Sequence, residues 1–511
     1  MFENSMALHV FLAVKQFVLS FYDSSVTKRV IMRFVAFLKR YFENSIVYRI
    51  FMCKSPAENM RRKSVIYRAV SASVNSIVSV FSRLYLYIKK NNTSGINRYI
   101  FDTLSEKKYF AYEYFCAALI AVMLIVPHNY WNNLYAVLFA FALLGLYFLR
   151  AVSKSGKVGI NVYAVPASLV SFLIITVSSA VMSPDRADSL RIALFFFSSV
   201  IFMLVICDGT GSALKLKNMV SIILAALLIM SLYAIWQNHV GVDVVAELTD
   251  LNANEGMPGR VYSTFENPNN FAEAIVLLIP FTYALFIISE KKISKLVYAG
   301  IFAVSAVALL MTYSRSCYVS FAIATVIFLI LYDWKYIIPL AVVGITAIPF
   351  LPESVLNRIL TIGSMNDTSN FYRIYLWGGI IKMISVYWVT GVGLGPGAFA
   401  AVYPRFAHHF ATTAPHSHML YLELIVELGI IGAVSFFVFI FFVFKKGLST
   451  FNKTSKELRC LIIAAVSGLC GIAFSCAAEY IWFYPRVMFV YWIVIGILLC
   501  AVRLSEIGKK A

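Results

Sequence analysis

The amino-acid sequence predicts an all-α polytopic membrane protein with about twelve transmembrane helices and a large helical extracytoplasmic loop. Hydrophobic residues make up 60% of the 511-residue chain and charged residues only 14%, with a mean hydropathy of +0.79. An ordinary soluble domain is about half apolar and a quarter charged. The apolar residues gather in runs near the ~20 residues that a bilayer crossing needs. Lysine-rich loops alternate with lysine-poor loops between these runs.

Residues 1–112 are predicted to form a basic amphipathic region that is cytoplasmic or lies on the membrane surface. They hold 18 Lys and Arg against 6 Asp and Glu, which gives +12 of the net charge of +19. Between residues 28 and 52 apolar side chains recur at helical spacing, while Arg33, Arg40 and Glu43 fall elsewhere around the helix. An anionic membrane surface is the partner that suits such a helix. A cytosolic helical extension packed on itself is the alternative.

The apolar runs divide into two groups of predicted spans. Residues 113–351 hold nine transmembrane helices, and residues 418–511 hold three more and a cytoplasmic tail. The first and the eighth run are short, and only "YSRSCY" separates the seventh from the eighth. The twelve predicted spans are 113–127, 134–150, 159–182, 190–207, 218–238, 268–289, 296–313, 316–332, 336–351, 418–444, 459–481 and 485–503.

The orientation of the spans follows from the lysines and arginines of the short loops, which are enriched on the cytoplasmic side of membrane proteins. Loops 150–157, 208–217, 290–295 and 445–459 are rich in lysine, whereas the loops between them, such as 239–267, contain little. We therefore predict that both termini are cytoplasmic and that the loops of the second set face outward.

One predicted outward loop, residues 352–417, is much longer than the other connections. It carries several aromatic residues and is not of low complexity. The stretch "SNFYRIYLWGGIIKMISVYW" predicts a helix inside it. The run "GVGLGPG" follows no strand, so turn glycines are favoured over a phosphate-binding loop. Loops of this length are usually functional or disordered, and the composition favours a folded extracytoplasmic cap.

Three arginines of the predicted outer face are candidates for a functional role. Arg260 precedes "ENPNN", a turn signal at which Asn267 or Asn269 could cap the sixth span; a capped helix start is the plain alternative. Arg315 stands between two spans with almost no loop, where a charge faces either a cavity or the outer headgroups. Arg373 lies in the long loop, where an arginine by itself is unremarkable.

Titratable groups cluster at the start of the tenth span. His416 and His418 directly precede it, and Glu423 and Glu427 share one face of its first turns by their spacing. The two histidines alone are a weak metal signal, since no Cys or Asp accompanies them at ligand spacing. Satisfied interfacial histidines are one reading. An acid–base or substrate-orienting role is the other, because neutral imidazole accepts protons near pH 7.

The order of these motifs resembles the family of O-antigen polymerases and O-antigen ligases. The elements that carry the resemblance are "RVYSTFENPNNFA", "TYSRSCYV", "YRIYLWGGIIKMISVYWVTGVGLGPGAF" and "HSHMLYLELIVELGIIG". The resemblance covers residues 260–440 by motif and 113–503 by span layout. Two positions depart from the family pattern: Ser263 replaces a glycine, and Met419 replaces the asparagine that usually follows the second histidine.

The resemblance implies a glycan donor linked to a polyprenyl diphosphate and a sugar hydroxyl on an acceptor glycan as the attacking group. Arginine binds phosphate through two parallel charge-assisted hydrogen bonds, so Arg260, Arg315 and Arg373 are candidate diphosphate-binding residues. No cluster of aspartates exists on the predicted outer face. We therefore expect no metal and no cofactor.

The attacking hydroxyl must lose a proton. His418 is the first candidate base and His416 the second; Glu423 and Glu427 are candidates to orient a histidine or to replace it. The function predicted first is polymerisation of lipid-linked repeat units at the outer face of the bacterial cytoplasmic membrane, with a chain-length regulator as a further candidate partner and no nucleic acid. A ligase acting on another acceptor is the alternative. A flippase, in which Glu273 and Glu479 line a path, is the non-enzyme alternative.

Overall fold

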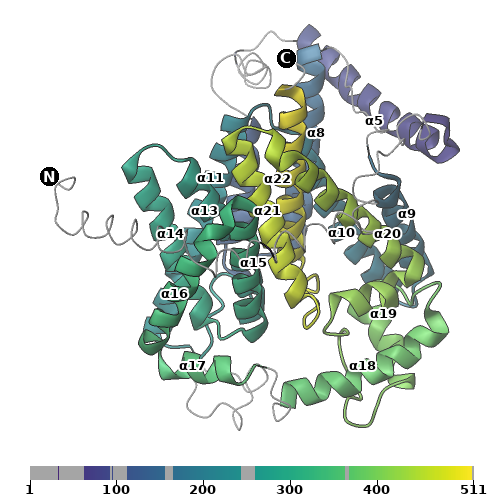
Figure 1. Ribbon diagram of the computed structural model, residues 1–511. Coiled ribbons are helices and arrows are strands. Elements are labelled where there is room, and N and C mark those ends of the chain that lie inside the picture. Colours follow the sequence, from purple (N-terminus) through teal and green to yellow (C-terminus); the bar gives the residue numbers. More distant parts are fainter. Residues whose placement is uncertain are drawn as a thin grey trace. The chain divides into compact units, whose positions relative to one another are not determined.

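A computed structural model describes residues 33, 62–91, 95, 112–155, 165–242, 259–362 and 368–508, and every regular element in these ranges is helical. The chain divides into two units, Met1–Ser64 and Val65–Ala511. The second unit is described here (Figure 1). The predicted amphipathic stretch 28–52 lies outside the described residues except for Arg33.

Several neighbouring helices of the second unit are joined by short connections, and a long segment with helices of its own precedes the helix that begins at Leu420. In chain order the helices are α5 (Val65–Lys90), α7 (Tyr112–Ile125), α8 (Asn133–Ser155), α9 (Ala167–Met182), α10 (Arg186–Gly209), α11 (Ala213–Val240), α12 (Pro268–Leu278), α13 (Pro280–Ile288), α14 (Lys292–Met311), α15 (Arg315–Asp333), α16 (Ile337–Ala347), α17 (Glu353–Leu360), α18 (Thr368–Tyr387), α19 (Gly395–Val402), α20 (Leu420–Thr450), α21 (Lys456–Ser475) and α22 (Pro485–Gly508).

Among the described residues, ten helical segments are long and apolar enough to cross a membrane, and α7 and α9 are shorter apolar helices. The prediction of an all-α polytopic membrane protein is confirmed. Two details differ from the predicted layout. The eighth and ninth predicted spans form one segment, Arg315–Phe350, interrupted by a turn at 334–336. Residues 65–87, inside the predicted surface region, also meet the criteria of length and composition for a span.

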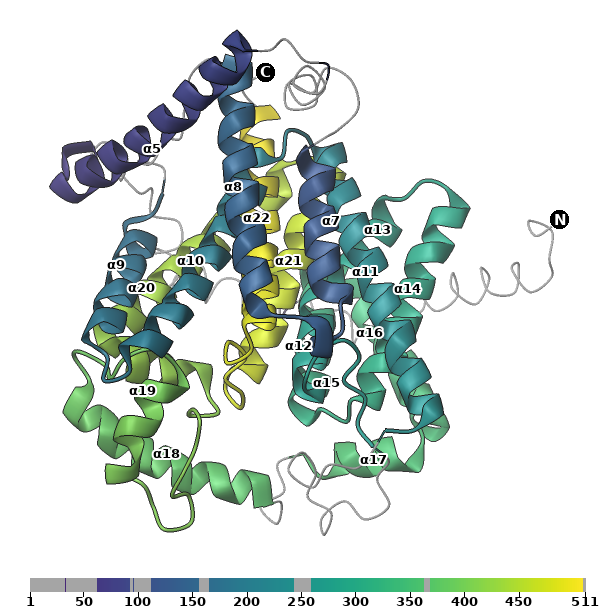
Figure 2. The same cartoon turned by 180° about the vertical axis from the view of Figure 1, so that it is seen from behind.

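The core of the bundle is centred on α12, α13, α21 and α22, which are the most buried of the candidate spans. Trp492 of α22 stacks on Phe439 of α20 and Phe172 of α9, with ring centroids 5.5 and 6.3 Å apart. Figure 2 shows the opposite side, where α7 packs beside α11 and α8 beside α10. Aromatic and aliphatic side chains thus hold helices from both halves of the chain together.

Polar contacts gather at the two opposite ends of these helices. At one end, which we call the Glu113 end, the buried Glu113 carboxylate contacts Arg150, Lys215 and the backbone N–H of Gly211. Arg503 of α22 donates to backbone carbonyls of the same region. Arg150 and Lys215, which belong to two of the lysine-rich stretches, therefore meet at Glu113. The other end contains His416 and His418, and we call it the histidine end.

At the histidine end the long segment before α20 folds around its own small hydrophobic core, separate from that of the bundle. Leu376 and Ile380 of α18 pack there with Phe399 of α19 and Tyr403, and Val426 joins them from α20. The helix predicted from "SNFYRIYLWGGIIKMISVYW" is confirmed as α18, and it packs against α20. This segment forms a folded lobe, residues 368–419, that carries part of the site.

The lobe meets α20 at a kink. Gly429 has φ 67° and ψ 176° inside α20, a conformation that is essentially restricted to glycine. The kink frees the carbonyl of Val426, which accepts the N–H of Val392, and the N–H of Ile430 donates to Trp388. The glycines of "GVGLGPG" are turn glycines, since Gly391, Gly393 and Gly395 all have positive φ. The close crossing fixes the lobe on the first turns of α20.

Candidate active site

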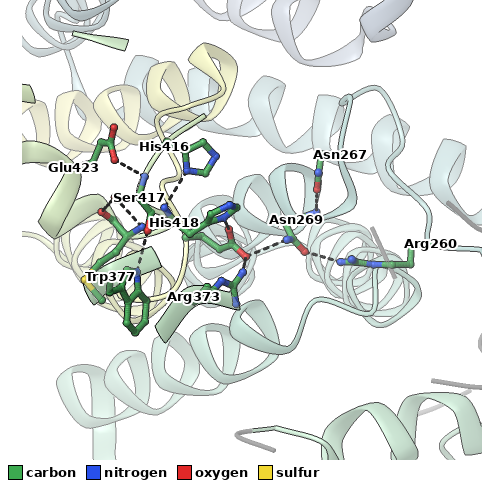
Figure 3. Close-up of polar contacts among 11 residues, drawn as sticks. Arg260, Asn267, Asn269, Arg373, Trp377, His416, Ser417, His418 and Glu423 are labelled. Carbon is green, nitrogen blue, oxygen red and sulfur yellow. Dashed lines mark hydrogen bonds and ion pairs between the residues drawn. The ribbon is translucent and has the colours of Figure 1, made fainter. Parts of the chain in front are cut away.

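The first part of the site is the start of α12. Asn267 caps the helix by accepting the N–H of Asn269 at 2.8 Å, which leaves the Asn269 side chain free to bridge two other residues. Its oxygen accepts from Nη2 of Arg260 at 2.6 Å, and its amide nitrogen donates to Glu479 at 3.2 Å. The Nε of Arg260 donates to the carbonyl of Thr312 at 2.8 Å. Figure 3 shows Arg260 and Asn269 in this arrangement.

The second part is Glu479, which lies between α21 and α22. Nη2 of Arg373, from the first half of α18, donates to Oε1 of Glu479 at 2.6 Å. The same oxygen accepts from Asn269, and Oε2 lies 3.7 Å from Nδ1 of His418. One carboxylate therefore links residues from α12, α18 and the loop before α20, three segments that are far apart in the sequence.

The third part is the loop that carries the two histidines. Its central residue, Ser417, is fixed from both sides: its N–H donates to Oε2 of Glu423 at 2.6 Å, and its carbonyl accepts from Nε1 of Trp377 at 2.9 Å. Nδ1 of His416 accepts the backbone N–H of His418 at 3.0 Å (Figure 3). These bonds hold His418 at φ 52°, a left-handed conformation uncommon for residues other than glycine.

The ring of His418 is partly exposed, whereas the backbone of its loop is held by hydrogen bonds. Its side chain is 27% exposed, and its Nδ1 has no hydrogen-bond partner among the described residues. The separation of 3.7 Å from Glu479 is longer than a hydrogen bond, but catalytic hydrogen bonds are often long in unliganded enzymes. The Tyr372 ring lies edge-on to His418, with centroids 6.3 Å apart. His418 thus presents its ring to solvent beside a carboxylate.

The charges of the cluster are set by burial and by each other. Burial alone raises the pKa of the Glu479 carboxyl, but Arg373 and then the two histidines oppose it and lower this pKa to about 2. Burial lowers the pKa of Arg260 to about 10 against the opposing effect of Glu479. Both groups are charged at neutral pH, so Glu479 balances two nearby arginines with one negative charge.

His416 differs from His418 in its surroundings. It is buried, and its ring lies against Phe483 and Tyr480 with centroid separations of 4.3 and 5.6 Å. Burial, and next the neighbouring His418, lowers the pKa of His416 to about 3. With Nδ1 already accepting a hydrogen bond and the ring uncharged, His416 is suited to position His418 rather than to take up a proton.

The two predicted glutamates are both buried in the first turns of α20 and contact backbone rather than the Glu479 cluster. Glu423 holds Ser417, as described above. Glu427 accepts the N–H of Gly395 at 2.8 Å and the hydroxyl of Tyr480 at 3.1 Å. Glu423 therefore orients the histidine loop, and Glu427 ties the start of α19 to the connection before α22.

Of the three predicted arginines, Arg260 and Arg373 meet at Asn269 and Glu479, whereas Arg315 lies at the start of α15. Nη1 of Arg315 donates to the carbonyl of Thr361 at 3.2 Å, and its charge lies close enough to Arg260 to lower the pKa of that group. Arg358 of α17 is buried beside it and donates to the carbonyl of Tyr313. Arg358 was not singled out from the sequence.

Sequence reasoning did not assign Glu479 or Asn269 to the site. Glu479 was noticed only as a charge lining a path, and Asn269 only as a helix cap. The position of Glu479 in the sequence could have indicated a functional role. It is the only acidic residue in the predicted outward loop "EYIWFYP", and it follows a long apolar span. Within the described ranges, no three His, Cys, Asp or Glu residues gather as a metal site would require.

In the part of the chain that the structure describes, ten apolar helices of spanning length indicate a multi-pass membrane protein. Arginines, a carboxylate and a histidine form a polar cluster at one end of its bundle. Residues 274–437 match the family model described as O-antigen ligase, so this part of the chain is similar to that family. No curated protein matches the sequence.

The match confirms the resemblance found in the sequence and supports an activity of the O-antigen ligase or polymerase type in general. Such an enzyme is a membrane glycosyltransferase, for which the family implies a lipid-linked glycan donor and an acceptor. The matched range contains Arg315, Arg373 and the histidine loop. Arg260, Asn269 and Glu479 lie outside it, and the fold brings Arg373 and His418 to them.

Proposed function

We propose that this protein polymerises oligosaccharide repeat units linked to a polyprenyl diphosphate, at the outer face of the bacterial cytoplasmic membrane. The observation that carries the proposal is the continuous set of contacts from Arg260 through Asn269 and Glu479 to Arg373 and His418. It combines two cations suited to an anionic leaving group with a histidine suited to a proton, all at one end of the bundle.

The two arginines support diphosphate binding. A guanidinium offers up to five N–H donors in a planar fork that matches two phosphate oxygens. One N–H group of Arg373 donates to Glu479, and the Arg373 side chain is 18% exposed. Because Arg260 is buried and bound to Thr312 and Asn269, it would act on the diphosphate mainly through its charge.

His418 supports deprotonation of the acceptor. With Glu479 facing Nδ1, the favoured neutral tautomer carries its proton on Nδ1 and leaves Nε2 free to accept one. In the proposed step Nε2 takes the proton of the acceptor hydroxyl as its oxygen bonds to the anomeric carbon. The bond from that carbon to the diphosphate breaks, and the polyprenyl diphosphate leaves with the electron pair. Glu479 then stabilises the imidazolium.

The position of the site suits a lipid-bound donor. His418 lies two residues before α20, which begins at Leu420 and belongs to a candidate span. A polyprenyl chain in the bilayer would present its diphosphate at the headgroup level, beside such a helix end. The lysine-poor loops favour the outer face for the histidine end.

Ligation is the second candidate, because the matching family model is described as O-antigen ligase. In a ligase the same step transfers a finished glycan once, to a different acceptor. The difference lies in the acceptor and not in the residues that activate the donor.

The test is the product made by the purified protein in vesicles from a lipid-linked oligosaccharide repeat unit. Polymerisation predicts a ladder of products that grows in steps of one repeat from this substrate alone. A single addition, and only when a second acceptor is supplied, would identify a ligase. Movement of unaltered donor across the bilayer without any new glycosidic bond would contradict both activities.

A further inference from the structure

Five aromatic rings form a cluster on the lobe, which we call the aromatic platform. Its members are Phe371, Tyr375, His408, His409 and Phe410. Tyr375 stacks on His408 with centroids 4.4 Å apart and an interplanar angle of 28°, and Phe410 contacts Tyr375 at 5.1 Å. The cluster is thus a continuous surface of rings from α18 and from the turn at 408–411.

Backbone contacts fix the turn that carries half of the platform. The N–H of Ala411 donates to the carbonyl of His408 at 2.8 Å, and the buried hydroxyl of Tyr403 donates to the carbonyl of Ala411 at 2.7 Å. The N–H of Phe410 donates to Nδ1 of His408 at 3.3 Å. The rings are therefore held in place without a ligand, as a binding surface requires.

Two phenylalanine rings of the platform are exposed to solvent, which is unfavourable for folding. Phe371 is 44% exposed and Phe410 is 54% exposed, and apolar surface in water is unfavourable. The lobe has a hydrophobic core of its own in which such side chains could have been buried. Exposed apolar surface gathered in one patch commonly marks a binding site.

The platform is next to the proposed reaction site. Tyr372, which follows Phe371 on α18, has its ring 6.3 Å from that of His418, and its hydroxyl donates to the carbonyl of Thr413 at 2.6 Å. One helix therefore positions the rings of the platform and Arg373, and one loop leads from the platform to His418. A chain molecule reacting at His418 would pass close to these rings.

The mixture of groups fits a sugar better than a lipid. Sugar rings have apolar C–H faces, which lie well on aromatic rings, and hydroxyl edges, which need hydrogen-bond partners. Because Nδ1 of His408 accepts a backbone N–H, its Nε2 carries a proton and can donate to a hydroxyl. Aromatic residues also gather at membrane interfaces, but none of the five lies in a candidate span.

We propose that the aromatic platform is a carbohydrate-binding subsite that holds sugar rings of a glycan next to His418. The proposal rests on the function proposed above and extends it to how the glycan, rather than the diphosphate, is held. The glycan on the platform belongs either to the donor or to the acceptor, and the recognised chemistry is the same.

The test is binding of a lipid-free probe to the purified full-length protein in lipid nanodiscs. The probe is the oligosaccharide released by mild acid from the producing cell's own lipid-linked glycan. We expect Phe410→Ala and Tyr375→Ala each to weaken binding by about tenfold or more, and Phe410→Trp to retain it, because stacking needs a ring. The matched control is Phe350→Ala, which removes a phenylalanine that is 87% exposed outside the platform and should bind like the wild type.

His418→Ala should also bind the probe like the wild type, which separates this proposal from the proposed reaction. A rise in KM for the acceptor in Phe410→Ala would place the acceptor on the platform, and a rise in KM for the lipid-linked donor would place the donor there. Unchanged probe binding in both alanine variants would overturn the proposal. If the wild type binds the probe but shows no transfer activity, the proposed reaction would be overturned and the proposed binding role of the platform would not.

Discussion

At the scale of single residues, the Glu479 carboxylate has a double role. It neutralises part of the charge of Arg373 and Arg260 while no donor is bound, and it faces Nδ1 of His418. A diphosphate entering the site would bring its own negative charge to the same arginines. We therefore expect donor binding to loosen the contact between Glu479 and Arg373 and to leave the carboxylate available to His418.

The two arginines of the cluster can be tested by substitution. Arg373→Ala should abolish product formation while the protein still inserts, with some loss of thermal stability because the Glu479 carboxylate loses its ion pair. Arg373→Lys should restore little, because one ammonium cannot offer the two parallel hydrogen bonds of a guanidinium. Arg260→Ala should abolish product formation as well, with some loss of stability from the lost bond to Thr312.

Product formation by each variant, normalised to the amount of folded protein in the membrane, measures this prediction. Arg405→Ala is the matched control, since Arg405 is an exposed arginine of the lobe. Full activity in Arg373→Ala would mean that the diphosphate is held elsewhere.

His416 should make the protein sensitive to mild acid. Its pKa is lowered in the folded protein to about 3 from an ordinary 6.5, so the unfolded chain binds the proton more readily between these values. The contribution of neutral His416 to the free energy of unfolding is therefore complete above pH 6.5. It decreases as the pH falls, by about 2 kcal/mol at about pH 5.

Thermal unfolding at about pH 7.5 and about pH 5 checks this prediction. The drop should be smaller in His416→Gln and unchanged in His409→Gln, which alters an exposed histidine. An equal drop in all three proteins would contradict it.

The identity of several site residues could be predicted from the sequence, but their contacts could not. Arg260, Arg373 and His418 stand in recognisable motifs, and they do meet. Asn269 and Glu479 stand in no motif that names a role, and their contacts span 210 positions. Single-sequence patterns describe local spacing, and only the fold brings the end of α21 next to the start of α12.

At the scale of elements, α20 determines where the histidines lie. Met419 occupies the position before the helix and provides no side-chain cap, while Glu423 reaches back to Ser417. An asparagine at this position, as in the family pattern, would be placed to cap the helix. The Ser263 position has φ 54°, which explains why a glycine is usual there. Both departures therefore concern backbone geometry.

Gly429→Ala should destabilise the protein severely. An added Cβ would lie 2.1 Å from the carbonyl oxygen of Val389, and the conformation with φ 67° is itself strained for alanine. We expect a loss of about 3 kcal/mol or more, or failure to fold. Gly300→Ala is the matched control: it lies in α14 with no atom within 4 Å of an added Cβ, and it should be neutral or slightly stabilising.

The measurement is the thermal midpoint of the two variants in the same detergent. A midpoint for Gly429→Ala equal to that of Gly300→Ala would show that α20 straightens without cost. The position of this kink was not predicted from the sequence, because an apolar run of 418–444 gives the same hydropathy whether the helix is straight or bent. The start and length of the helices followed the apolar runs much more closely.

At the scale of the whole molecule, the described helices join two groups of loops with different charge. The loops near Glu113 are rich in lysine, and those near the histidines are not. The orientation of the twelve predicted spans was inferred from this segregation. The structure adds α5, whose Tyr67 and Phe81 contact Val165 and Phe148. Hydropathy alone could not separate a surface helix from a span at this position, because α5 combines arginines with an apolar face.

The predicted topology has the lobe outside and the loop 445–459 inside. Single cysteines introduced at the exposed positions Thr412 and Ser449 test it in intact cells with a membrane-impermeant maleimide, and the parent protein is the control. Position 412 should label at once, and position 449 only after the membrane is permeabilised. Labelling of 449 in intact cells with 412 protected would reverse the orientation and place the histidine end in the cytoplasm.

The most direct test of the proposed chemistry is transfer by purified His418→Gln, with the wild type, His416→Gln and Glu479→Gln measured beside it. Glutamine keeps some hydrogen bonding but cannot accept a proton, so His418→Gln should lose about 10² to 10⁴ in turnover while it still binds the lipid-linked donor. Glu479→Gln should lose turnover too, His416→Gln should lose less, and a chelator should change none of these rates. An active His418→Gln enzyme would remove His418 as the base and contradict the proposed mechanism.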